Sequence, residues 1–459
     1  MLHLHVFDLD VVGFHSWRQT QTQTVIYNFV FHDNNILHPQ RLDLNLGSTD
    51  LKYEFPLYQW IIAQFDKVFG YYMLNTRLLS FVFFVSLLLG FYKLLLQFTS
   101  NTAALIGNAL LCFSPLLHYY CVNPIPDVLA LSLSVWALYL HFLYQQEAGI
   151  KNYLLFVIFI SLATLCKLPF ILFGTVVIIP AWKKRKQGEW KQVMLEMIIL
   201  LIGLFPAALW YIQAAASWKG NPVTGGLLQN DKDLITLLDY AWFTLTSSVP
   251  ELLTNFAACL LLFAGIYRYS SLKNKGSHIT APLLVPFISF LLFYLYEINL
   301  IEKTHDYYLL PFLPFLFLVV TYGANQWIGQ GRSKWVLVFV CIAPITAWLR
   351  IDHRWNVRSP GYNTDLLEKQ ELFRQLIPEH EKCIVYYDHS RFISLYFLKR
   401  QGYSLEENEL DQALLHDLYD KDCRFLLSED ISLDLNKFPD YDLQKIYAGK
   451  LLLFKIKRK

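Results

Sequence analysis

Long apolar runs alternate with short polar segments over the first 350 residues of the chain. A helix needs about 20 mostly apolar residues to cross the hydrocarbon core of a bilayer, and ten runs come near that length. The pattern therefore predicts a mainly α-helical, polytopic transmembrane bundle over residues 76–350. The fourth and fifth runs meet at Lys167-Leu168-Pro169 and are counted separately, because the basic loops then fall on one side. The expected spans are residues 77–97, 102–121, 127–144, 152–166, 168–182, 194–214, 252–268, 281–298, 307–325 and 335–350.

Basic residues gather in the loops that follow the fifth, seventh and ninth spans. These loops cover residues 183–191, 268–275 and 332–334. Cytoplasmic loops of membrane proteins are rich in Lys and Arg, so this side is assigned to the cytoplasm. Residues 1–75 and the C-terminal tail are then predicted to lie outside the cytoplasm.

The first 75 residues precede the first expected span. Residues 1–8 have neither the charged n-region nor the long apolar h-region of a signal peptide, so we expect that a preceding span is missing from this reading frame. The alternative is that the first visible span acts as a reversed anchor. Residues 52–68 end in a predicted amphipathic surface helix with Val68 on its apolar face and Asp66 on its polar face. The alternative is that these residues form an interfacial belt that only anchors the loop to the membrane surface.

From Gly361 onward, short apolar runs alternate with segments of helical periodicity. This pattern suggests a small α/β domain with a partly parallel sheet over residues 360–459. No glycine-rich phosphate loop follows a predicted strand, so nucleotide binding is not indicated. A structural or acceptor-handling cap is the expected role. The expected helices are residues 366–376, 392–398 and 409–419, and the expected strands are residues 384–387, 425–427 and 451–456.

Composition divides the chain at the same point. Of the 99 residues from Gly361 onward, 33 are charged, against 43 of the 360 residues before it. The whole chain is 17% charged, below the roughly 25% that is usual for soluble domains, and its 16% aromatic content excludes a disordered chain. A net charge of +2 gives no reason to expect a nucleic-acid partner. The composition fits a membrane protein with a soluble tail.

Seven cysteines are scattered along the chain without a CxxC pair or a Cys/His cluster, so no metal site is expected. Cys383 and Cys423 alone lie in the tail. We expect both to be small buried side chains, and the alternative is a disulfide between them in an oxidising compartment.

The first loop carries a polar and aromatic run, His15-Ser16-Trp17-Arg18-Gln19. The planar fork of Arg18 suits two phosphate oxygens, and no carboxylate is close to it in the sequence. A solvated loop residue is the alternative for Arg18.

Two ionisable residues stand at the outer ends of later spans. Asp127 opens an apolar helix after two prolines, where the alternative role is to stabilise the helix N-terminus. Lys167 lies between two spans, where an ionisable group is costly and tends to be paired or functional. A lysine that snorkels to the membrane surface is the alternative.

Another polar group precedes the ninth span. It contains Lys303 and His305, followed by Tyr307 and Tyr308. An aromatic belt at the membrane surface would explain the two tyrosines but not the histidine.

The predicted topology brings these groups to one boundary of the membrane. Cations at the level of the headgroups fit a lipid phosphate, and a carboxylate can deprotonate a hydroxyl acceptor. A lipid-linked phosphosugar would use both features. The groups expected to converge are Arg18, Lys167, Lys303, His305, Glu54 and Asp127.

Five motifs in this order resemble those of bacterial glycosyltransferases of the C-type membrane fold. More closely, they resemble the family-39-like branch, which is similar to protein O-mannosyltransferases and lipid A aminoarabinose transferases. The resemblance covers about residues 10–350. The motifs are His15-Ser-Trp-Arg-Gln-Thr, His38-Pro-Gln-Arg-Leu-Asp, Glu54-Phe-Pro-Leu-Tyr, Pro126-Asp127 and His305-Asp-Tyr-Tyr-Leu-Leu-Pro.

The resemblance implies an inverting glycosyltransferase in the bacterial cytoplasmic membrane. Its donor would be a polyprenyl-phosphate sugar, its acceptor a glycan, lipid or protein on the outer face, and it would need neither a cofactor nor a metal. The alternatives are a transporter or flippase of lipid-linked precursors and a scaffold that displays the tail. A transporter should carry its polar residues near the midplane, whereas here they gather at one face.

The resemblance also implies roles for individual residues. Asp127 matches a carboxylate that opens a membrane helix, and Glu54 lies in a motif where better-known members have a lysine beside the proline. Phe55 stands in that place, so the phosphate contact is expected from Lys52 or Lys167. His15 stands where other members have an acidic residue, and the base is therefore left open, with Asp8 and Asp10 as further candidates. The implied catalytic residues are Asp127, Glu54 and His15, the donor-phosphate ligands Arg18, Lys52, Lys167 and His305, and the substrate-lining residues Trp17, Gln19, Tyr307 and Tyr308.

Overall fold

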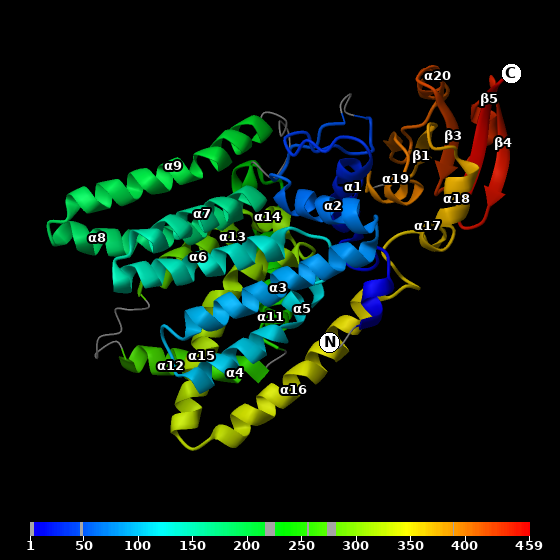
Figure 1. Ribbon diagram of the computed structural model, residues 1–459. Coiled ribbons are helices and arrows are strands. Elements are labelled where there is room, and N and C mark those ends of the chain that lie inside the picture. Colours follow the sequence, from blue (N-terminus) through cyan, green and yellow to red (C-terminus); the bar gives the residue numbers. More distant parts are fainter. Residues whose placement is uncertain (1–3, 46–48, 216–224, 255–256, 273–280, 389) are drawn as a thin grey trace.

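The computed structural model describes residues 4–45, 49–215, 225–254, 257–272, 281–388 and 390–459. Helices form one large bundle, and a small sheet lies beyond one end of it (Figure 1). The predicted fold class is confirmed. The helices of the bundle are α3 (Met73–Leu95), α4 (Asn101–Cys112), α5 (Pro115–Tyr120), α6 (Asp127–Glu147), α7 (Ile150–Cys166), η2 (Leu168–Val177), α8 (Ile178–Lys186), α9 (Trp190–Ala215), α12 (Ala257–Leu272), α13 (Ala281–Tyr296), η6 (Asp306–Phe312), α15 (Leu313–Gly329) and α16 (Ser333–Ile351).

Shorter elements lie at the end of the bundle that carries the sheet. They form the N-terminal segment and the connections between the long helices at this end. They are η1 (Leu4–Asp8), α1 (Ser16–Phe31), α2 (Leu57–Phe69), η4 (Gly226–Gln229), α10 (Leu234–Phe243), η5 (Thr244–Ser248), α11 (Val249–Leu252), α14 (Ile298–Ile301) and η7 (Asp352–Trp355).

Each of the ten predicted spans corresponds to helical structure. Among the described residues, five helical segments are long and apolar enough to cross a membrane, and shorter apolar helices account for most of the remaining ranges. The chain is a multi-pass membrane protein. The five segments are Met73–Leu95, Asp127–Glu147, Trp190–Ala215, Asp306–Gly329 and Ser333–Trp355.

The fourth and fifth predicted spans are separate segments. Helix α7 ends at Cys166, and Lys167 has extended backbone angles, φ −162° and ψ 118°. Pro169 lacks the N–H group that a continuing helix requires, which favours a break here. The chain then turns back, and η2 packs against α7.

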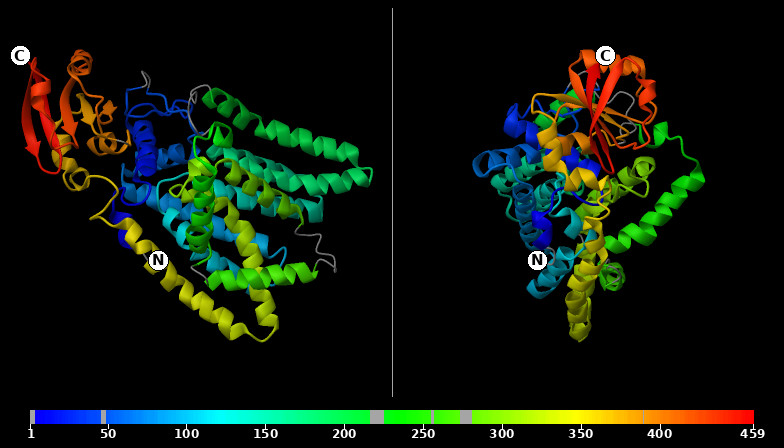
Figure 2. Two further views of the ribbon diagram at one scale, coloured as in Figure 1. Left: turned by 180° about the vertical axis from the view of Figure 1, so that it is seen from behind. Right: turned by 90° about the vertical axis from the view of Figure 1, so that its right-hand side faces the viewer.

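Opposite ends of the bundle differ in charge. The turns after α8 and after α15 lie at the end away from the sheet, whereas α1, α2 and the tail lie at the other end (Figures 1 and 2). This is the arrangement that the basic loops predict. Lys273 and Lys275, which belong to the same prediction, lie outside the described residues.

The predicted polar face of helix α2 is wrong at Asp66. Asp66 is only 1% exposed and accepts a hydrogen bond from Asn75 Nδ2 at 2.8 Å, because α3 begins beside it and supplies that donor. Val68 and Phe69 are 74% and 60% exposed. Apolar side chains on an outward face suit contact with lipid, so the helix still fits the membrane surface.

The tail contains the predicted partly parallel sheet, in the strand order β2-β1-β3-β5-β4. Strand β1 pairs in parallel with β2 and β3, and β5 pairs antiparallel with β3 and β4. Strands β2 and β4 were not predicted, and the expected helix at 366–376 is divided in two. The elements are α17 (Thr364–Glu368), α18 (Gln370–Leu376), β1 (Lys382–Tyr386), α19 (Ile393–Leu398), β2 (Gly402–Leu405), α20 (Gln412–Asp420), β3 (Cys423–Ser428), η8 (Leu435–Lys437), β4 (Tyr441–Ala448) and β5 (Leu452–Arg458).

The two tail cysteines are buried free thiols, as the sequence leads us to expect. Apolar side chains from both faces of the sheet form two separate cores, one of which contains Cys383 and the other Cys423.

The N-terminal segment joins the tail sheet at its β2 edge. Leu44 N donates to Gly402 O at 2.8 Å, and Gly402 N donates to Leu42 O at 3.1 Å. Tyr396 OH also donates to Asp10 Oδ1 at 2.6 Å. Asp10, one of the candidate bases, therefore connects the first loop to the tail.

Candidate active site

Helix α1 begins at a strained turn held by the end of the last span. His15 has φ 58° and ψ 34°, a left-handed conformation that is uncommon for a residue with a side chain. Gly13 has φ 88°, and a Cβ atom there would lie 1.7 Å from Arg354 O, so only glycine fits. This close approach sets where α1 starts, and hence where Arg18 lies.

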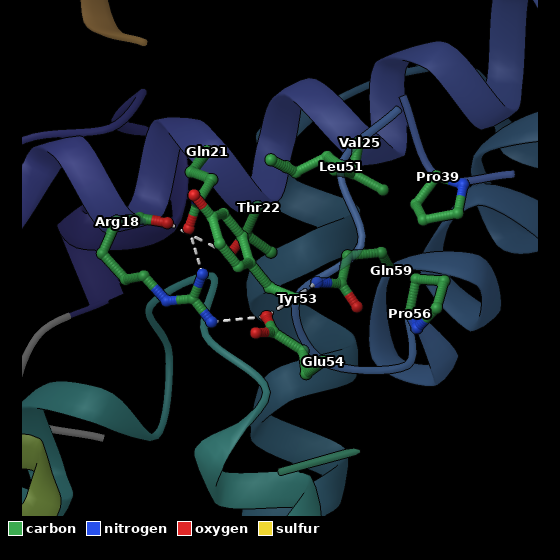
Figure 3. A pocket seen from close by; sticks show the side chains of 10 residues that line it. All are labelled: Arg18, Gln21, Thr22, Val25, Pro39, Leu51, Tyr53, Glu54, Pro56 and Gln59. Carbon is green, nitrogen blue, oxygen red and sulfur yellow. Dashed lines mark hydrogen bonds and ion pairs between the residues drawn. The ribbon is translucent and has the colours of Figure 1, made fainter. Parts of the chain in front are cut away.

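A small pocket lies between α1 and the segment before α2 (Figure 3). Arg18, which is 8% exposed, donates from Nη1 to Gln21 Oε1 and from Nη2 to Glu54 Oε1. No carboxylate is close to Arg18 in the sequence, but the fold brings Glu54 to it from 36 positions away. The lining residues are Arg18, Gln21, Thr22, Val25, Pro39, Leu51, Tyr53, Glu54, Pro56 and Gln59.

Phe55 holds this segment against the bundle. Its ring packs edge-on against Trp210 at 5.0 Å between centroids, and its N–H donates to Leu165 O at 3.1 Å. The motif residue next to the proline is therefore an apolar anchor. It places Glu54 near the corner at Lys167.

A second buried ion pair lies at that corner. Lys167 Nζ donates to Asp127 Oδ1, and their side chains are 13% and 2% exposed. Asp127 Oδ2 is buried without a hydrogen-bond partner. Pro126, and not Asp127, is the N-cap of helix α6, but Asp127 lies in its first turn, where a carboxylate stabilises the helix N-terminus. The alternative of a snorkelling Lys167 is wrong, because this lysine is buried in the pair with Asp127.

Two tyrosines of η6 face the same lysine. Lys167 Nζ lies 4.4 Å from the centroid of the Tyr307 ring and 4.8 Å from that of Tyr308. A cation over an aromatic face is attracted by the ring quadrupole. Tyr307 is 5% exposed, so this ring belongs to the site and not to an aromatic belt.

The two ion pairs form one electrostatic cluster. Burial alone would lower the pKa of Arg18, but Glu54, with smaller contributions from Tyr307 and Asp127, raises it above its usual value. Arg18 is therefore fully charged next to a second cation, Lys167. The predicted convergence is confirmed for Arg18, Lys167, Glu54 and Asp127.

Two histidines stack beside this cluster. The rings of His15 and His305 are 5.7 Å apart between centroids and nearly parallel. Burial, and then the neighbouring His15, lower the pKa of His305 to about 4. His305 is therefore neutral at pH 7 and can contact a phosphate only as a hydrogen-bonding group. Trp17 packs edge-on against His305 at 6.0 Å.

Asp306 is a buried carboxylate that sequence reasoning missed as a site residue. It accepts a hydrogen bond from Tyr120 OH, and Arg354 Nη2 donates to its Oδ2 at 3.0 Å. The same Arg354 nitrogen contacts Glu251, which also accepts from Arg350 Nε at 2.8 Å. The sequence held one signal for this group: Arg350 and Arg354 lie at the end of the last span that the basic loops predict to be outside the cytoplasm, where the positive-inside rule does not expect them.

Other candidates lie at or beyond the edge of the cluster. Gln19 is fully buried and donates to Phe14 O at 2.9 Å, so the amide that lines the pocket is that of Gln21. Lys52 is half-buried and does not line the pocket. Lys303 was expected in the cluster but pairs with Asp239 on the surface, because α10 packs beside it. Asp8 is exposed.

Among the residues that the structure describes, no group of three His, Cys, Asp or Glu side chains could hold a metal ion. The expectation of a reaction without a metal or cofactor stays a prediction.

Comparison with known proteins places this arrangement in a wider group. A family model described as dolichyl-phosphate-mannose-protein mannosyltransferase matches residues 54–211, about a third of the chain. ArnT from Cupriavidus metallidurans in the apo state superposes with a TM-score of 0.69 at 11% sequence identity, over 99% of this chain and 96% of that chain. The chain has the GT-C fold. The resemblance predicted from the motifs is thereby confirmed.

Two further solved structures are similar to this GT-C chain. ArnT from Cupriavidus metallidurans bound to undecaprenyl phosphate superposes with a TM-score of 0.69 at 12% identity, over 99% of this chain and 96% of that chain. The Archaeoglobus fulgidus oligosaccharyltransferase in complex with Zn and sulfate gives a TM-score of 0.60 at 13% identity, over 91% of this chain and 64% of that one. A search among curated proteins found no match.

Proposed function

We propose that the chain is an inverting glycosyltransferase that moves a sugar from a polyprenyl-phosphate donor to an acceptor hydroxyl at the outer face of the bacterial cytoplasmic membrane. The observation that carries this proposal is the pair of buried ion pairs, Arg18 with Glu54 and Lys167 with Asp127, at one end of a helical membrane bundle. Buried charges at the edge of a bilayer are costly and tend to be kept for function.

Arg18 and Lys167 are the proposed ligands of the donor phosphate. When the bond between the sugar and the phosphate breaks, negative charge grows on the departing phosphate. Cations fixed at that point stabilise the transition state more than the ground state. The fork of Arg18 can contact two phosphate oxygens, and Lys167 supplies a point charge.

A base must also remove the proton of the acceptor hydroxyl. Asp127, Glu54 and His15 are the candidates, and all three lie at the same end of the bundle. Tyr307 and Tyr308 offer aromatic faces against which a sugar ring can pack.

Two comparisons support a lipid-linked donor. The family match covers Glu54, Asp127 and Lys167, and a structure with the same fold was solved with undecaprenyl phosphate bound. The sugar, the acceptor and the inverted stereochemistry belong to the proposal.

Purified full-length protein in liposomes tests the proposal. A panel of undecaprenyl-phosphate monosaccharides, labelled in the sugar, is supplied together with envelope lipid, glycan and protein fractions. We expect one donor to release undecaprenyl phosphate as its label moves to an acceptor. A transporter or flippase would move the labelled lipid across the bilayer with its sugar still attached. Mass spectrometry of envelope glycans, with and without the gene, then identifies the product.

The proposed location also predicts the sidedness of the chain. In a Cys341→Ser background, Glu407→Cys in the tail should react with a membrane-impermeant maleimide in intact cells, because the tail lies outside the cytoplasm. Gln187→Cys, in the basic turn at the other end, is the matched control and should react only after permeabilisation. Both positions are exposed. If the tail cysteine were protected in intact cells while Gln187→Cys reacted, the predicted orientation would be wrong and the chain would lie the other way round in the membrane.

A further inference from the structure

The contact between His15 and Asp306 is not used by the phosphate site. We propose that His15 is the base that deprotonates the acceptor hydroxyl, and that Asp306 is the positioning residue that holds its imidazole and stabilises the imidazolium. This inference rests on the proposed function and assigns the base that the proposal leaves open.

His15 is a buried imidazole aimed at a carboxylate. Its Nε2 atom lies 3.6 Å from Asp306 Oδ1 and has no hydrogen-bond partner. With Nε2 turned toward Asp306, the Nδ1 atom is the nitrogen left to accept a proton. The left-handed backbone of His15 aims the ring, and strain of this kind is typical of functional positions.

The ring of Tyr307 separates His15 from the proposed phosphate site. Its centroid is 5.2 Å from that of His15 and 4.4 Å from Lys167 Nζ. The proposed base is therefore one aromatic ring away from a proposed phosphate ligand. Arg18 follows His15 by one turn of α1, and Arg18 N donates to His15 O at 2.9 Å.

Asp306 is held by groups on two other elements. Tyr120 of α5 donates to Oδ1, and Arg354 of η7 donates to Oδ2. Glu251 of α11 shares Arg354 and also binds Arg350, so the guanidinium of Arg354 is not balanced by Asp306 alone. Asp306 Oδ1 remains directed toward His15.

Charged and titratable groups from several elements face His15. Asp306 supplies the negative charge, and His305, stacked on the other side, is neutral because burial lowers its pKa to about 4. Tyr307 and Tyr120 pack around the ring, with centroids 5.2 Å and 6.3 Å away. Arg354 binds Asp306 and also lies over the ring of Phe14, which packs edge-on against His15.

The other two candidate bases are less suited to this role. Asp127 and Glu54 each balance a buried cation, and a proton on either would leave Lys167 or Arg18 without its counter-charge. An unpaired buried charge is strongly unfavourable. A proton on His15 instead forms an ion pair with Asp306.

In the proposed step one proton is transferred, one bond to the anomeric carbon forms and another bond to that carbon breaks. The acceptor hydroxyl gives its proton to His15 Nδ1, and its oxygen forms a bond to the anomeric carbon of the donor sugar. The bond from that carbon to the phosphate oxygen breaks, and its electron pair leaves with the polyprenyl phosphate. The products are the glycoside, polyprenyl phosphate and an imidazolium, which later releases its proton to water.

The test uses full-length protein with the donor found in the panel. His15→Asn should lower kcat by about 10²- to 10⁴-fold, as expected for loss of a general base. Asp306→Asn should lower kcat at least about tenfold and move the acid limb of the pH–rate profile to lower pH, because the imidazolium loses its counter-charge. Asp306→Glu keeps the negative charge, so the acid limb of its pH–rate profile should lie close to that of the wild type. Asp239→Asn removes a surface carboxylate that pairs with Lys303 and is the matched control.

Two further measurements separate this role from a structural one. The ¹⁵N shifts of the His15 ring should report a proton on Nε2 in the wild type and a mixture of tautomers in Asp306→Asn. Undecaprenyl phosphate should bind His15→Asn as it binds the wild type. If an active Asp306→Asn protein kept the wild-type tautomer and pH–rate profile, the roles proposed for His15 and Asp306 would be wrong, while the proposed function would stand. A wild-type protein that transfers no sugar would overturn the proposed function, and this inference with it.

Discussion

Asp127→Asn is expected to lower sugar transfer by about 10²- to 10³-fold, the usual loss when a group that stabilises transition-state charge is displaced. Asparagine has nearly the same shape but cannot balance Lys167, which it leaves charged and buried. Removing one partner of a buried ion pair costs about 3–5 kcal/mol, so the melting temperature of the variant should also fall. Initial rates in liposomes and thermal unfolding in detergent measure the two effects.

A double variant separates stability from activity. Asp127→Asn with Lys167→Met removes both charges, so the melting temperature should recover while transfer stays low, because the proposed phosphate ligand is gone. Asp239→Asn, which breaks the exposed pair with Lys303, should change neither quantity. Wild-type transfer by the double variant would return the Lys167–Asp127 pair to a purely structural role.

Arg18→Lys is expected to lower turnover by about 10²-fold, and Arg18→Ala by more, because a fork that binds two oxygens becomes a point charge and then disappears. Binding of undecaprenyl phosphate should weaken in the same order. Isothermal titration in detergent measures binding, and the liposome assay measures turnover.

Glu54→Gln is the matched control for Arg18. It keeps the side-chain shape but removes the negative charge that now holds the arginine, so undecaprenyl phosphate should bind several-fold more tightly. Arg18→Ala with unchanged binding and rate would remove Arg18 from the site and move the phosphate contact to Lys52 or Lys167.

Local periodicity predicted most of the secondary structure. Bilayer burial imposes a length and an apolar composition on each span, and both are visible in one stretch of sequence. The missed strands lack such a signal. Strand β2 has only four residues and begins with a glycine, and strand β4 is an edge strand with largely exposed side chains. A very short strand and an edge strand with exposed side chains both show little apolar alternation.

The motifs brought most of the site residues to notice but not their partners. Arg18 and Glu54 are 36 positions apart, and Asp127 and Lys167 are 40 positions apart. Nothing near any of these residues in the sequence specifies the pairing. Asp306 stood inside a quoted motif, yet its contact with His15 joins residues 291 positions apart and depends on how α1, α5, η6 and the last span pack.

The sequence by itself determined that the chain crosses a membrane many times, that its basic loops share one side, and that a small α/β domain follows the spans. It also brought to notice most of the polar residues that meet at one end of the bundle. Only the tertiary structure decided which charges pair, that Asp66 turns inward, and that His15 faces Asp306. The physical reason is that burial in lipid acts on each segment separately, whereas an ion pair depends on the positions of segments far apart in the chain.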